Sequence, residues 1–268
     1  MELLVRGPWA VELRRLLQNM TDISPELAEK GKEKIAKQLS GLEAKGKMSH
    51  EEIIAILSRI ETGTKSICRN CDLIIEAAVE DIQVKKQTFM ELEEIVPENC
   101  MFTSNTSSLS ITEIGNELKR PVAGMHFFNP APVLKLVEVI AGMNTPAEMI
   151  RKIKDIAADI GKVPVEVQEG PGFVVNRILI PMINEAIGIY ADGLASAQDI
   201  DTAMKLGASH PMGPLALGDL VGLDVVLAIM NVLYDETKDT KYRPHPLLIK
   251  MVRGGLLGRK SGKGFFNY

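Results

Sequence analysis

Cysteine, histidine, aromatic residues and long apolar runs are all scarce in this chain of 268 residues. Its three cysteines, Cys68, Cys71 and Cys100, are too few and too oddly numbered for a disulfide framework. Cys68 and Cys71 form a C-x-x-C motif, but the chain has no second pair and no histidine at ligand spacing, which disfavours a metal or redox site. We interpret Cys71 as a small residue that opens a buried strand, and we expect no metal.

The charge balance and the shortness of the apolar runs exclude several classes of protein. The formal net charge is -4, which leaves no basic footprint for nucleic acid or for an anionic membrane surface. No apolar run approaches the ~18 residues of a membrane span, and the N-terminus has no uninterrupted hydrophobic stretch of the signal-peptide type. We therefore expect a cytoplasmic protein that neither binds nucleic acid nor associates with a membrane.

Strand and helix patterns alternate over the first part of the chain. Two capped helices predict a solvated hairpin at about 24–60, and short apolar runs such as CDLIIEAAV then alternate with helices, as in an α/β sheet. From Gly170 the pattern becomes helical. We predict an α/β domain at 1–169 and an all-helical domain at 170–268. Helices are expected over Phe173–Leu194, Ser196–Leu206 and Gly218–Leu233.

The segment NRILIPMINEAIGIY in the first of these helices is apolar nearly all round. Such a helix must be buried in a bundle or against a second subunit. We therefore expect a homodimer that forms through the C-terminal helices.

His126 and Glu138 form the first candidate for catalysis. His126 ends a predicted strand, Asn129-Pro130-Ala131-Pro132 turns the chain, and Glu138 stands in the apolar strand LVEVI. If the two strands are neighbours they lie ~5 Å apart, close enough for the carboxylate to accept a hydrogen bond from the imidazole. Such a carboxylate would fix the tautomer and suit the ring to take a proton from an alcohol. The alternative is a core histidine and a glutamate at a strand edge, and spacing does not decide between them.

Two other polar sites have equally open interpretations. The segment SNTSSLSI follows the strand that ends at Ser104, where loop hydroxyls and amides either line a ligand cleft or cap a helix. Asn176 lies in an apolar helix and needs hydrogen-bond partners there. It is therefore either a packing residue or a contact to a ligand.

Several longer motifs together resemble one family. SNTSSLSITE, GMHFFNPAPVLKLVEVI, PGFVVNRILIPMINEA and GRKSGKGFF are similar to segments of the short-chain L-3-hydroxyacyl-CoA dehydrogenases, and most similar to those of the bacterial 3-hydroxybutyryl-CoA dehydrogenases. The resemblance runs from about Asp22 to the end of the chain. It implies a Rossmann-like NAD-binding domain followed by an all-α domain, NAD as cofactor and an acyl-CoA substrate.

The resemblance also implies roles for individual residues. His126 would be the general base that takes the proton from the C3 hydroxyl as hydride leaves for NAD, and Glu138 would orient it. Ser107 would contact the substrate oxygen and the nicotinamide, while Asn176 would fix the substrate near the reacting carbon. The expected cofactor contacts are Asp22, Glu80, Lys85, Ser107, Asn129 and Lys260.

The first 22 residues depart from the family pattern. They lack its G-x-G-x-x-G turn, and their one glycine, Gly7, precedes Pro8, which has no amide to donate to a phosphate. Reading the codons of Met1–Arg15 one base upstream permits the string GVIGAGAMGSGIAQ, which suggests a frameshift that the nucleotide sequence can test. The segment also offers no apolar run for a second strand before Asp22.

Three interpretations of function therefore remain open. Intact His126 and Glu138 favour an enzyme that oxidises (S)-3-hydroxybutyryl-CoA to acetoacetyl-CoA with NAD, or runs the reverse reaction. The absent glycine loop favours a CoA-binding or structural scaffold without turnover. A 3-hydroxyacid dehydrogenase of the 6-phosphogluconate type is the third interpretation, and it would place a lysine base on the helix that here carries Asn176.

Overall fold

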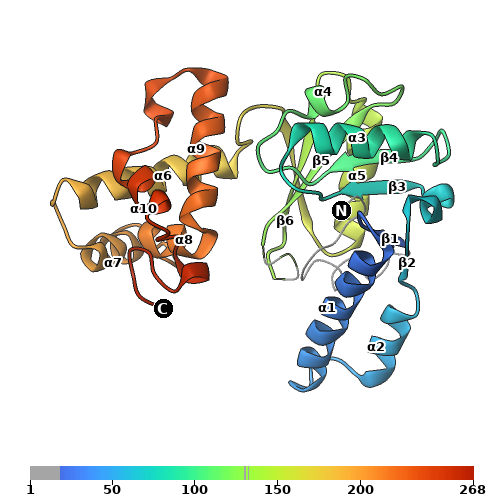
Figure 1. Cartoon of the computed structure of the whole chain (residues 1–268), viewed down its shortest axis with the longest axis horizontal. Helices are drawn as coiled ribbons and strands as arrows, with labels where there is room; N and C mark the ends of the chain where they lie inside the picture. Colours follow the sequence, from blue (N-terminus) through green and yellow to red (C-terminus); the bar gives the residue numbers. More distant parts are fainter. Residues whose placement is uncertain (1–18, 130, 132) are drawn as a thin grey trace. The chain divides into compact units, whose positions relative to one another are not determined.

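The computed structural model describes residues 19–129, 131 and 133–268 (Figure 1). The chain divides into two compact units, Met1–Gly170 and Pro171–Tyr268. Our predictions about the glycine-rich loop and the frameshift fall on residues that lie outside the described part of the chain.

The described residues of the first unit form a five-stranded sheet in the order β3-β4-β5-β6-β7. Its strands are β3 (Leu73–Glu76), β4 (Met101–Ser104), β5 (Val122–Phe127), β6 (Leu136–Ala141) and β7 (Val163–Gln168). β3, β4 and β5 are parallel, whereas β6 runs antiparallel to β5 and parallel to β7. All six residues of β5 are buried, as expected for a central strand.

Three helices connect the strands of this sheet. They are α3 (Ile82–Glu93), α4 (Ile111–Ile114) and α5 (Ala147–Asp159). Asp81 caps α3 by accepting hydrogen bonds from the backbone amides of Gln83 and Val84. The alternation of strand and helix agrees with the sequence pattern.

The helical hairpin consists of α1 (Pro25–Glu43) and α2 (His50–Leu57). Ser24 caps α1, and Ser49 with Glu52 forms the predicted capping box at the start of α2. These local signals are sufficient to start both helices, since each involves residues three apart.

A short parallel pair of strands flanks the hairpin. β1 (Asn19–Thr21) pairs with β2 (Glu61–Gly63), and Asp22 follows directly on β1. The sequence offers no apolar run before Asp22, yet a strand stands there. A three-residue strand needs no apolar run, because Met20 and Thr21 are buried and β2 supplies the hydrogen-bond partners.

The 3-10 helix η2 (Lys65–Asn70) connects β2 to β3. Cys71 ends this helix, since its backbone amide donates to the carbonyl oxygen of Cys68 at 2.9 Å. β3 begins only at Leu73. Cys71 therefore does not open the strand, because its backbone is engaged in closing the preceding turn.

The second unit is helical in its described elements. They are α6 (Val175–Ala191), α7 (Ala197–Gly207), α8 (Pro214–Val221), α9 (Leu223–Thr237), η3 (Thr240–Tyr242), α10 (Pro246–Arg253) and η4 (Arg259–Ser261). Side chains from α6, α8, α9 and α10 share one buried core, which includes Ile183, Leu215, Met230 and Leu248.

The single helix predicted over Gly218–Leu233 is in fact two. Gly222 separates α8 from α9 with a φ of 102°, a backbone conformation that L side chains rarely adopt.

Among the described helices, none by itself is long and apolar enough to cross a membrane. α8 and α9 meet the criterion of length and composition only when taken together, and they are bent by 96° relative to each other.

Candidate active site

His126 and Glu138 are directly opposite each other in the antiparallel pair of β5 and β6. The Nδ1 atom of His126 lies 2.8 Å from Oε2 of Glu138, and the two residues are 4% and 1% exposed. The His126 ring also packs against Phe128, with 4.5 Å between the ring centroids. Because Nδ1 is hydrogen-bonded to the carboxylate, the other ring nitrogen, Nε2, would exchange the proton with a substrate.

The loop SNTSS is held at the carboxyl end of β4. The backbone amide of Asn105 donates to the carbonyl oxygen of Glu76 at 2.7 Å, and the Asn105 side-chain oxygen accepts from the amide of Phe127 at 2.8 Å. The second bond ties the loop to the residue that follows His126. Sequence reasoning missed Asn105, and its place in the first polar loop after a buried strand was the only signal.

Glu80 organises the same loop. Its Oε1 atom accepts hydrogen bonds from the hydroxyl of Thr106 at 2.7 Å and from the backbone amides of Ser107 at 2.8 Å and Ser108 at 3.0 Å. The Ser108 hydroxyl also donates to this oxygen at 3.2 Å, so one carboxylate oxygen accepts hydrogen bonds from four donors around Ser107. Glu80 and Ser107, which the sequence proposed separately, are brought together by the structure.

Lys85 belongs to a buried ionic cluster behind this loop. Its Nζ atom lies 2.9 Å from Oε1 of Glu76 and 3.6 Å from Oε2 of Glu80. The hydroxyl of Ser104 donates to Glu76 at 2.5 Å, and the side chains of Lys85 and Glu76 are completely buried. Sequence reasoning missed Glu76, although an acid at the end of the apolar run LIIE was its signal. Lys85 therefore contacts Glu80 directly and is connected to Ser104 through Glu76.

Asp22 and Asn129 lie in different surroundings. Asp22 is 4% exposed at the carboxyl end of β1, and its Oδ1 atom accepts from the backbone amide of Ile23 at 2.7 Å. An acid at this place in a nucleotide-binding sheet suits the hydroxyls of a ribose. Asn129 is exposed and follows His126 by three residues.

Asn176 and Lys260 are described within the second unit. Asn176 is the second residue of α6 and is partly buried. The Nζ atom of Lys260 lies 2.5 Å from Oδ1 of Asp224, an ion pair that the sequence did not indicate. Partial burial acts to raise the pKa of Asp224, but the hydrogen bond and charge of Lys260 hold it below the ordinary value.

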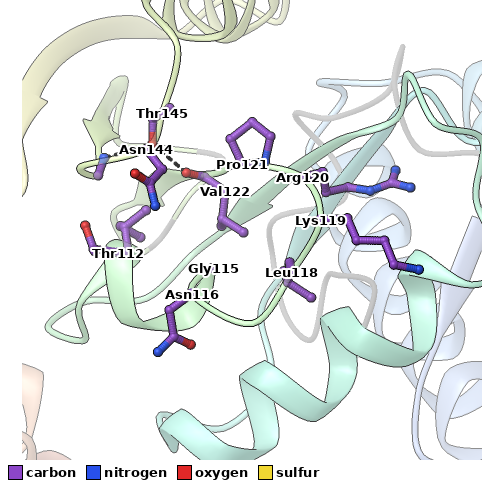
Figure 2. Close-up of a pocket in the computed structure, with 12 residues that line it drawn as sticks. Thr112, Gly115, Asn116, Leu118, Lys119, Arg120, Pro121, Val122, Asn144 and Thr145 are labelled. Carbon is purple, nitrogen blue, oxygen red and sulfur yellow. Dashed lines mark hydrogen bonds between the residues drawn. The ribbon is translucent and has the colours of Figure 1, made fainter.

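A separate pocket of about 280 Å³ lies at the opposite end of β5 (Figure 2). Val122, which begins β5, lines it together with Thr112 and Thr145, and the Thr145 hydroxyl donates to the Val122 carbonyl at 2.6 Å. None of our proposed site residues lines this pocket. Ligands of such sheets bind at the carboxyl ends of the strands, so we place the candidate site at the His126 end of β5.

Two family models cover nearly the whole chain. The 3-hydroxyacyl-CoA dehydrogenase NAD binding domain matches residues 14–170, and the 3-hydroxyacyl-CoA dehydrogenase C-terminal domain matches residues 172–268. The chain belongs to the 3-hydroxyacyl-CoA dehydrogenase family. Our prediction of the family is confirmed, as are the Rossmann-like domain followed by helices, the dehydrogenase activity class and NAD as cofactor.

Individual relatives agree with this assignment. The chain is 59% identical over 235 residues to the 3-hydroxybutyryl-CoA dehydrogenase of Clostridioides difficile, with 87% of this chain and 84% of the relative covered. It is 41% identical over 258 residues to the human mitochondrial hydroxyacyl-coenzyme A dehydrogenase, with coverages of 94% and 80%. The crystal structure of (S)-3-hydroxybutyryl-CoA dehydrogenase PaaH1 from Ralstonia eutropha superposes with a TM-score of 0.92 at 44% identity, covering 97% of this chain and 93% of that one.

Proposed function

We propose that this dehydrogenase oxidises (S)-3-hydroxybutyryl-CoA to acetoacetyl-CoA with NAD, or catalyses the reverse reduction, and that His126 is the general base. The buried contact of 2.8 Å between His126 and Glu138 supports this role most directly. The choice of 3-hydroxybutyryl-CoA as substrate is supported by the similar proteins that are named 3-hydroxybutyryl-CoA dehydrogenase.

The chemistry assigned to the pair is a proton transfer. Bound NAD would supply the nicotinamide ring that accepts hydride from the C3 carbon of the substrate. His126 takes the hydroxyl proton at Nε2 as the carbonyl forms, and the negative charge of Glu138 stabilises the imidazolium that results. In the reductive direction the same nitrogen returns the proton to the carbonyl oxygen.

The other proposed contacts rest on the resemblance and on the loop geometry. Ser107 would contact the substrate oxygen and the nicotinamide, in a loop whose shape Glu80 fixes. Asp22 would bind the adenosine ribose, for which its burial at the end of β1 is suitable. Glu80, Lys85, Asn129 and Lys260 remain proposed cofactor contacts, and Asn176 remains a proposed substrate contact.

The second candidate is a CoA-binding or structural scaffold with little turnover. The observation that favours it is the absence of a G-x-G-x-x-G turn from the sequence of residues 1–22. NADH oxidation by the purified chain with acetoacetyl-CoA, at low and at very high NADH, separates the two. Turnover that needs very high NADH supports an enzyme with weakened cofactor binding. No turnover at any NADH, from a folded protein, favours the scaffold.

We also propose a cytoplasmic homodimer that forms through the second unit. Large apolar side chains are exposed on its helices, including Ile178 at 68% and Leu206 at 80%. Such surface favours association with a second copy. Light scattering on the purified chain tests the proposal, and a monomer at all concentrations would contradict it.

A further inference from the structure

Cys68 and Cys71 stand at the two ends of the turn that closes η2. The hydrogen bond of 2.9 Å between the Cys71 amide and the Cys68 carbonyl closes a four-residue turn. A turn of this kind brings its first and last α-carbons within ~7 Å, and disulfides span ~4.4–6.8 Å between α-carbons. Each thiol also shifts the pKa of the other, as expected for two sulfurs that lie close together. The pair is therefore placed to form a disulfide within one turn.

The two thiols differ in exposure and in their partners. Cys68 is completely buried, whereas Cys71 is partly exposed. The Nδ2 atom of Asn19 donates to the sulfur of Cys71 at 3.3 Å and to the carbonyl oxygen of Ile67 at 2.9 Å. Cys71 is thus the more accessible of the two residues, and Cys68 is shielded from solvent.

The two thiols also differ in pKa. The hydrogen bond with Cys68, and to a smaller extent the one with Asn19, lowers the pKa of Cys71 to about 6 against the opposing effects of burial and of Asp72. The bond to Cys71, together with burial, raises the pKa of Cys68. The lowered pKa of Cys71 favours its thiolate near neutral pH, and the raised pKa of Cys68 favours its thiol.

The third cysteine provides an internal comparison. Cys100 is 4% exposed, and burial raises its pKa to about 12. A buried and protonated thiol reacts slowly with peroxide itself, which holds for Cys68 and Cys100 alike. Cys68 shares a four-residue turn with Cys71, whereas Cys100 comes from a different segment and is therefore expected to stay reduced when the pair reacts.

We propose that Cys68 and Cys71 form a reversible redox site, in which peroxide oxidises Cys71 and Cys68 then closes a disulfide. The Cys71 thiolate attacks one oxygen of hydrogen peroxide, the O–O bond breaks, and hydroxide leaves as the sulfenic acid forms. The sulfur of Cys68 then attacks the sulfenic sulfur, the S–O bond breaks, and the Cys68 proton leaves with the oxygen as water. The proton that Cys71 released on ionising converts the hydroxide to water, so two thiols and one peroxide give one disulfide and two waters.

This oxidation would act on β1 through Asn19. A thiolate is a charged acceptor for the Asn19 amide, whereas a disulfide sulfur is a weak one. Asn19 begins β1, and Asp22 directly follows that strand. The contact between β1 and η2 would weaken in the oxidised chain.

Peptide mapping by mass spectrometry of the full chain, after hydrogen peroxide and again after dithiothreitol, tests the proposal. The expected product is a Cys68–Cys71 disulfide, seen as a loss of two hydrogen atoms that dithiothreitol reverses. C68S and C71S should not form it, and C100S should form it at the wild-type rate. Far-UV circular dichroism checks that each variant is folded.

The wild-type chain alone can overturn the proposal. If Cys71 instead accumulates two or three oxygens while Cys68 stays reduced, then Cys68 does not resolve the sulfenic acid. A disulfide that involves Cys100 or a second chain would show that the turn does not pair these two thiols. Either product, or no oxidation of Cys71 at all, excludes the proposed site.

Discussion

His126 and Glu138 share one buried hydrogen bond of 2.8 Å between Nδ1 and Oε2. The chain contains a second pair of the same kind, since Nδ1 of His50 lies 3.1 Å from Oε1 of Glu43 in the helical hairpin. The His50 side chain is 71% exposed, compared with 5% for His126. The hydrogen bond is common to both pairs, so burial in the sheet is what distinguishes the candidate catalytic pair.

His126→Gln is expected to lower kcat for acetoacetyl-CoA reduction by ~10²- to 10⁴-fold, because general acid–base catalysis contributes about this much. Binding of the CoA ester should stay nearly unchanged, since the substitution removes a proton carrier and little contact area. Steady-state kinetics and calorimetric titration measure the two effects. His50→Gln is the control and should leave both unchanged. Equal loss of binding and turnover in His126→Gln would contradict the role.

Glu138→Gln is expected to lower kcat by about 10²-fold or more, because the amide cannot stabilise an imidazolium as the carboxylate does. Groups that act as a unit are non-additive, so His126→Gln with Glu138→Gln should be no slower than His126→Gln alone. The double-mutant cycle in kcat measures this, with Glu43→Gln as control. Fully additive losses would mean that Glu138 acts independently of His126.

Lys85→Met is expected to destabilise the first unit by ~3–5 kcal/mol, because it leaves the buried carboxylate of Glu76 without its ammonium partner. Lys119→Met is the matched control. Lys119 pairs with Glu94 at 3.3 Å, but both side chains are more than 70% exposed, and such pairs contribute only ~0–1 kcal/mol. Urea unfolding followed by circular dichroism compares the variants. Equal midpoints would show that the Glu76–Lys85 pair does not stabilise the first unit.

Glu80→Ala is expected to lower kcat/KM by about 10- to 100-fold, because Thr106, Ser107 and Ser108 lose their shared acceptor. Hydrogen bonds to a charged group contribute ~1.5–3 kcal/mol each, which is enough to shift the loop. Glu80→Gln keeps an acceptor oxygen and should recover part of the loss. Glu98→Ala, at an exposed position, is the control. An unchanged kcat/KM in Glu80→Ala would mean that the loop holds its shape without this carboxylate.

Alkylation of Cys71 by iodoacetamide is expected to rise with pH, to be half-maximal near pH 6, and to level off above neutral pH. The sign follows from the lowered pKa of the thiol, since the reactive thiolate predominates above that value. Cys68→Ala should move the profile to higher pH, because the hydrogen bond with Cys68 is the largest cause of the lowering. Mass spectrometry of the Cys71 peptide gives the rates. A wild-type profile centred near pH ~8.5, the ordinary thiol value, would contradict the assigned environment.

Much of the fold could be predicted from the sequence, because the signals for its helices and strands lie in neighbouring residues. The capping box of Ser49 and Glu52 involves residues three apart, and apolar runs such as LIIE reflect burial along one strand. The sequence Asn129-Pro130-Ala131-Pro132 predicted that the chain turns between His126 and Glu138. These features need only neighbouring residues, so the sequence by itself determined the alternation of elements and the candidate pair.

Only the tertiary structure decided how distant side chains combine. The pairing of Glu76 with Lys85 and the gathering of Thr106, Ser107 and Ser108 around Glu80 depend on which strand ends lie side by side. The break at Gly222 and the three-residue strand before Asp22 have no periodic signal of their own. The register of β5 against β6 places His126 opposite Glu138, and a shift of one residue would send one side chain to the other face of the sheet. Sequence therefore determined which residues could act, and the packing of the sheet decided which of them meet.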